Sequence, residues 1–152
     1  MLAALYFAQA LPMGLAWLGL PPWLRSQGVG LEAIGALGLT FLPWALKFLW
    51  AAPVERLCVR YGVRPVIIVT QGAAALAFAA LAPTDAAIAL PAAIGLLIVL
   101  NALCATQDIA TDRYAILQRG AVGAARVNTA RFVGFTLGMF AGGSGLLLAG
   151  GR

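Results

Sequence analysis

The sequence contains no histidine, and its 152 residues include only five acidic residues and two cysteines. Without histidine, imidazole-based acid–base catalysis and histidine metal ligation are excluded. Cys58 and Cys104 lack the spacing of a metal site, and neither a metal centre nor a disulfide is expected from them. Charged residues make up 10% of the chain, whereas a soluble domain typically carries about 25%. The composition therefore excludes an ordinary soluble domain.

Long apolar runs dominate what is present: 62% of the residues are hydrophobic, and the mean hydropathy is +0.95. A membrane crossing needs about 20 predominantly apolar residues, so the sequence predicts an all-α polytopic membrane protein. The basic residues lie between the apolar runs, without the patch and interleaved aromatics of a nucleic-acid site, so the expected partner is the lipid bilayer and not nucleic acid. The five predicted spans are residues 2–23, 32–52, 65–82, 86–112 and 127–149.

Arginine residues are distributed unequally among the connections between these spans. The second connection holds three and the fourth also holds three, whereas the first holds only Arg25 and the third holds none. By the positive-inside rule, both arginine-rich loops and the N-terminus are predicted to be cytoplasmic. The first span lacks a basic leader and a small-residue cleavage site, which indicates a retained helix. The third connection is so short that its two spans should be antiparallel neighbours.

Two carboxylates occupy the end of the fourth span. Asp108 and Asp112 are four residues apart, so they lie on one helix face, one turn above the other. A carboxylate that faces lipid costs about 2.5–3.5 kcal/mol even on lenient insertion scales. The pair is therefore predicted to face protein or water and to be functional. The alternative is that both residues only mark the cytoplasmic helix end.

Two cations are the possible partners of these acids. Lys47 lies within the second span, where it either snorkels to the interface or pairs with Asp108 or Asp112. Arg131, just inside the fifth span, is the other candidate counter-ion.

Uncharged features of the spans also allow two interpretations. Gln9 and Asn101 lie deep in their spans, where each either joins two helices or contacts cargo, and Asn101 shares a helix face with Asp108. Glycines that recur every fourth residue make a flat ridge on the fifth span, suited to close helix packing and also to a sliding contact. These glycines are Gly134, Gly138 and Gly142.

Several segments resemble the AmpG-type branch of the major facilitator superfamily, which includes muropeptide permeases and the RhtX/FptX-type siderophore permeases. The resemblance covers almost the whole chain, and it is most specific in residues 42–51 and 105–112. The segments are residues 5–12 (LYFAQALP), 42–51 (LPWALKFLWA), 105–112 (ATQDIATD) and 131–139 (RFVGFTLGM).

This resemblance implies a twelve-helix permease with two six-helix halves that works by alternating access around a midplane site. It implies proton-coupled uptake of a polar solute across the bacterial inner membrane, without a metal or organic cofactor. The first, second, fourth and fifth helices would line the cavity, and the third would face lipid. The residues implied in proton coupling or in the substrate cavity are Asp108, Asp112, Lys47, Arg131, Asn101, Gln107 and Gln9.

The second connection would act as the cytoplasmic gate loop of such a permease. The superfamily usually carries Asp followed by a dense Gly-Arg-Arg cluster here, and this chain departs from that pattern, which predicts a looser latch. The residues concerned are Glu55, Arg56, Arg60 and Arg64.

Five spans are fewer than half of a twelve-helix permease, so residues 1–152 are expected to be a partial N-terminal domain whose partner is the missing C-terminal half. Two other functions stay open, and the Asp-x-x-x-Asp pair on a membrane helix fits the first of them. One is an intramembrane prenyl- or phosphotransferase that holds Mg²⁺ against a diphosphate, although the remaining acids match no second motif. The other is a membrane assembly subunit without transport activity. The choice of cargo, siderophore or muropeptide, stays open.

Overall fold

A computed structural model describes the backbone of residues 1–82 and 85–150, and the side chains of these residues except 119, 121–122 and 146–150. The described residues form helices and no strands, which confirms the all-α class. The elements are α1 (Leu2–Gly14), the π-helix η1 (Leu15–Gly19), α2 (Leu20–Ser26), α3 (Leu31–Gly35), the 3-10 helix η2 (Ala36–Phe41), α4 (Leu42–Leu46), α5 (Phe48–Tyr61), α6 (Val63–Leu81), α7 (Leu90–Val122) and α8 (Ala124–Gly150).

Within the described residues, three helices are long and apolar enough to cross a membrane, and a bent pair makes a fourth if it counts as one span. The three are Leu2–Ser26, Val63–Leu81 and Leu90–Gln118. They correspond to the first, third and fourth predicted spans. The predicted count of five is not confirmed, because the described part of α8 does not meet the same test.

The second predicted span, residues 32–52, is not one straight helix. Residues Leu31–Leu46 and Phe48–Tyr61 meet at an angle of 49°, with Lys47 at the break. Pro43 and Pro53 flank the break, and each lacks the N–H that would continue the helical hydrogen-bond ladder. The tighter 3-10 turns of η2 precede it. The bend therefore places Lys47 at a corner of the backbone.

The fourth helix extends beyond its predicted end at residue 112. It continues to Val122, and α8 begins at Ala124, so the expected fourth loop is a corner at Gly123. Gly123 has φ +84° and Gly62, between α5 and α6, has φ +91°. Both values lie in the left-handed region, which glycine adopts without steric cost. The sharp corners thus fall at glycines.

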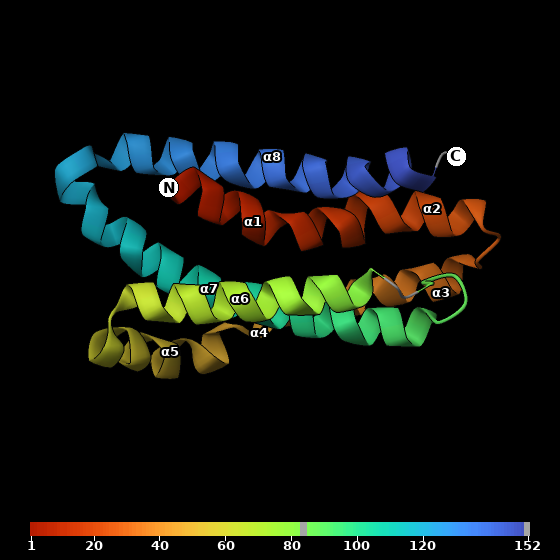
Figure 1. Ribbon diagram of the computed structural model, residues 1–152, viewed down its shortest axis with the longest axis horizontal. Helices are drawn as coiled ribbons and strands as arrows, with labels where there is room; N and C mark the ends of the chain where they lie inside the picture. Colours follow the sequence, from red (N-terminus) through yellow and green to blue (C-terminus); the bar gives the residue numbers. More distant parts are fainter. Residues whose placement is uncertain (83–84, 151–152) are drawn as a thin grey trace.

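Helix α7 lies at the centre of the bundle and contacts α1, α4, α5, α6 and α8. Helix α6 runs antiparallel beside α7, as the short third connection predicts (Figure 1). Only 17% of the most apolar part of α6 is buried, against 44% for Leu2–Ser26. This peripheral place agrees with the lipid-facing role that the resemblance gives the third helix.

Helices α1 and α8 pack side by side along most of their length (Figure 1). A Cβ atom on Gly134, Gly138 or Gly142 would overlap the backbone carbonyls of Ala3, Phe7 and Leu11 respectively. This register shows that the two helices are parallel. The predicted glycine ridge is therefore a close-packing surface, and α1 is the helix that packs against it.

Candidate functional site

Asp108, on the predicted acidic face of α7, forms an ion pair with Lys47, which lies at the corner between α4 and α5. The Lys47 ammonium Nζ lies 2.6 Å from Asp108 Oδ2. The Asp108 side chain is 4% exposed and that of Lys47 is 34% exposed. Of the two predictions for Lys47, the structure shows the ion pair, and it selects Asp108 as the partner.

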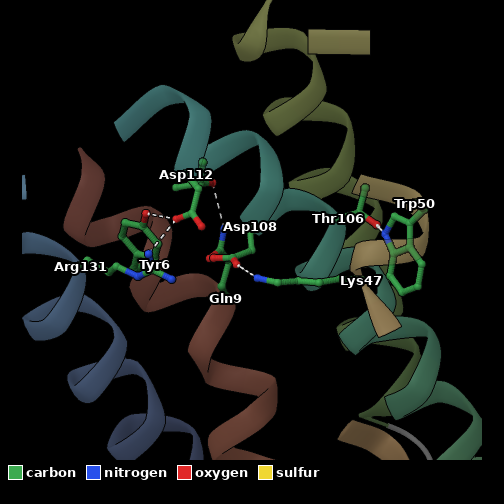
Figure 2. Close-up of polar contacts among 9 residues, drawn as sticks. Tyr6, Gln9, Lys47, Trp50, Thr106, Asp108, Asp112 and Arg131 are labelled. Atoms are coloured by element: carbon green, nitrogen blue, oxygen red, sulfur yellow. Dashed lines mark hydrogen bonds and ion pairs between the residues drawn. The ribbon is translucent and has the colours of Figure 1, made fainter. Parts of the chain in front are cut away.

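Asp112, one turn further along α7, binds groups from α1 and α8. Tyr6 donates its phenolic O–H to Asp112 Oδ1 at 2.7 Å, and Arg131 lies 3.1 Å from the same oxygen. The Arg131 guanidinium also lies over the Tyr6 ring, 5.3 Å from its centroid. Figure 2 shows Lys47 and Arg131 reaching the two acids from opposite sides.

The two glutamines of the predicted set lie on different sides of α7. Gln9, in α1, donates its Nε2 to Thr111 Oγ1 at 2.9 Å, next to the acids (Figure 2). Gln107 instead donates to Gln71 Oε1 of α6 at 2.7 Å, so the structure places it against α6 and not among the ion pairs. The Oε1 atoms of Gln9 and Gln107 are buried without a hydrogen-bond partner.

Two tryptophans complete the contact between α7 and the bent second span. Trp44 donates its indole N–H to Asn101 Oδ1 at 2.9 Å, and Trp50 donates to Thr106 Oγ1 at 3.1 Å. The ammonium of Lys47 lies 5.7 Å from the centroid of the Trp44 ring. The sequence analysis missed both indole bonds. No local pattern in the sequence signals these bonds, because Trp44 and Trp50 lie on opposite sides of the bend at Lys47.

The predicted gate residues lie in the second half of α5 and, in the case of Arg64, in the first turn of α6. Glu55 pairs with Arg113 of α7 at 2.5 Å, and Arg60 lies over the Tyr61 ring at 5.1 Å. Arg56 and Arg64 are exposed. Glu55 therefore connects α5 to α7 through its ion pair with Arg113.

We expect Glu55→Gln to lower the free energy of unfolding by less than about 1 kcal/mol, because both partners of the Glu55–Arg113 pair are partly exposed and water screens their attraction. Thermal unfolding of the purified protein in detergent measures this. Arg113→Gln serves as the matched variant. A loss of more than about 2 kcal/mol would show that the pair is a structural latch.

A cavity of about 680 Å³ lies apart from these ion pairs. Its walls are mostly apolar and come from α1, η1, α2, α6, α7 and α8, and its lining includes the charged residue Asp85. Apolar walls suit hydrocarbon better than charged groups. The candidate functional site is therefore the polar network around Asp108 and Asp112, where charged side chains from α7, α8 and the α4–α5 corner meet polar side chains from α1.

Comparisons with known proteins give a family. The chain is 29% identical over 110 residues to an uncharacterized protein of Haemophilus influenzae, an alignment that covers 71% of this chain and 26% of that protein. The chain thus spans about a quarter of the length of this relative. No solved structure matches the present chain.

Residues 1–85 match the family described as acetyl-coenzyme A transporter 1. This match favours a membrane transporter over the transferase and the assembly subunit, and it does not single out the AmpG-type branch. It includes the first three helical spans and Lys47, and it covers more than half of the sequence. The chain therefore belongs to the acetyl-coenzyme A transporter 1 family, a family of membrane transporters.

Proposed function

We propose that residues 1–152 form the N-terminal part of a proton-coupled transporter of the major facilitator type, in which Asp108 and Asp112 carry protons. The observation that supports this most directly is the Asp108 carboxylate, which is 4% exposed within a membrane helix and bound to Lys47. Intramembrane carboxylates are rare and mark ion and proton pathways. The family match supports transport itself.

The two ion pairs suggest how protonation would change the conformation. Lys47 joins the corner of α4 and α5 to α7, and Arg131 joins α8 to α7. A proton on either acid removes the negative charge that holds the corresponding cation. The helices on the two sides of α7 are then free to rearrange, as alternating access requires.

The family match and the resemblance support different choices of cargo. The family name refers to acetyl-coenzyme A, whereas the resemblance to AmpG-type permeases suggests a muropeptide or a siderophore. We propose uptake of such a polar solute across the bacterial inner membrane, with the N-terminus in the cytoplasm. The C-terminal half of the transporter would supply the opposite wall of the site.

We expect Asp108→Asn to abolish proton-driven uptake by the complete protein, because asparagine keeps the shape of aspartate and cannot carry a proton between the two sides of the membrane. Uptake of labelled acetyl-coenzyme A and of a labelled muropeptide into proteoliposomes under an imposed pH gradient measures this.

Glu32→Gln is the matched control for this experiment. Glu32 is an exposed acid in the first turn of α3, outside the network, and its replacement should leave uptake unchanged. If Asp108→Asn retained uptake driven by the pH gradient, the proposed proton-carrying role of Asp108 would be wrong.

A further inference from the structure

Each ion pair of the network has an accessible cation and a less accessible acid. The Lys47 side chain is 34% exposed and its partner Asp108 only 4%; Arg131 is 51% exposed and its partner Asp112 34%. In both pairs the cation is therefore more accessible to a solute than the acid that neutralises it. In the resting arrangement, however, the cations are already neutralised by their partners.

We propose that Lys47 and Arg131 bind an anionic group of the cargo, and that each becomes available when its acid partner takes up a proton. This inference rests on the proposed transport function and adds the chemical class of the cargo. Aromatic rings support the released cations, because Lys47 lies over Trp44 and Arg131 over Tyr6. Such cation–π contacts attract a cation independently of its acid partner.

The proton and charge balance of this exchange is simple. A hydronium ion of the solvent transfers its proton to a carboxylate oxygen of Asp108 and leaves as water, and the Lys47 ammonium then donates its hydrogen bonds to the anion in place of the carboxylate. One proton and one negative charge thus enter each pair together, and the net charge of the site does not change. The charged and titratable groups that face Asp108 are Lys47 from the α4–α5 corner, Arg131 from α8, Tyr6 from α1, and Asp112 and Cys104 on α7 itself.

The anion can be a phosphate or a carboxylate. Both are acceptors that an ammonium and a guanidinium bind strongly, and the guanidinium of Arg131 can bind either in a bidentate manner. Acetyl-coenzyme A carries phosphates and a muropeptide carries carboxylates, so these two probes distinguish the sources. Spermidine, a polyamine cation, is the probe of opposite charge.

The test is equilibrium binding of the three probes to the complete protein in nanodiscs, at mildly acidic and mildly alkaline pH. The wild type should bind one of the two anions about tenfold more tightly at the acidic pH. Asp108→Asn should bind that anion more tightly than the wild type at the alkaline pH and depend less on pH, because Lys47 is permanently released while Asp112 still holds Arg131. Lys47→Gln should lose about tenfold in affinity at acidic pH.

Asp112→Asn provides a second variant with the same expected direction, and it perturbs folding less because Asp112 is more exposed than Asp108. Tighter binding of spermidine than of either anion, or no change of anion binding in the folded variants, would overturn the inference. Measuring anion binding and uptake separately distinguishes a failure of this inference from a failure of the proposed function. Proton-linked anion binding without uptake would refute transport alone, and uptake without proton-linked anion binding would refute the anion exchange alone.

Discussion

Replacing Gly142 by alanine is expected to lower the free energy of unfolding by about 2 kcal/mol, although the change adds a single methyl group. A Cβ atom at this position would overlap the backbone carbonyl of Leu11 in α1, which cannot rotate away as a side chain can. Helix α1 must then move away from α8. Overpacking of this kind typically costs about 1–3 kcal/mol, and here it also separates helices that bring Tyr6 and Arg131 to Asp112.

Gly145→Ala is the matched control for this prediction. Gly145 lies on the same helix, and a Cβ atom there meets nothing within 4 Å. The control should be neutral or slightly stabilising, because alanine favours the helix over glycine by about 1 kcal/mol. Thermal or SDS-induced unfolding of the purified protein in detergent measures both variants. Equal effects at the two positions would show that the close contact between α1 and α8 does not stabilise the protein.

Replacing Lys47 by glutamine is expected to cost about 3 kcal/mol of stability, because it leaves the Asp108 carboxylate buried without its cation. Breaking a buried ion pair by removing one partner typically costs about 3–5 kcal/mol. The lower end applies here because the Lys47 side chain is 34% exposed. The unfolding measurements used for the glycine variants also determine this loss.

The double variant Lys47→Gln/Asp108→Asn decides whether the loss comes from the pair. A neutral glutamine beside a neutral asparagine leaves no buried charge, so most of the stability lost in Lys47→Gln should return. Proton-driven uptake should not return, because no titratable carboxylate remains at position 108. If the double variant were as unstable as the sum of its single variants, the pair would not be coupled.

The helical class and most chain reversals could be predicted from the sequence, and the bend and the length of α7 could not. Apolar run length identifies segments that suit a bilayer, and glycine marks the corners, as at Gly62 and Gly123. The bend at Lys47 falls inside one predicted span, and the length of an apolar run does not mark it. Helix α7 continues past Asp112 because a helix need not end where its apolar part ends.

The site, too, could be predicted from the sequence only in part. The four-residue spacing of Asp108 and Asp112 placed both on one helix face, and the depth of Lys47 made it a possible partner. That Lys47 binds Asp108 while Arg131 binds Asp112 depends on how α4, α5 and α8 cross α7, and no local pattern encodes such crossings. The bond between Trp44 and Asn101 was missed for the same reason.

The pairing of α1 with α8 has a consequence for biosynthesis. Ala3 packs against Gly134, so α1 requires α8, the last described helix, as its partner, although α1 is synthesised well before it. At about 5–20 residues per second, α1 waits in the membrane for roughly ten seconds before that partner is made. During this interval the α1 face that carries Phe7 and Leu11, and the hydroxyl of Tyr6, are without their native contacts, and lipid or the insertion machinery must cover them.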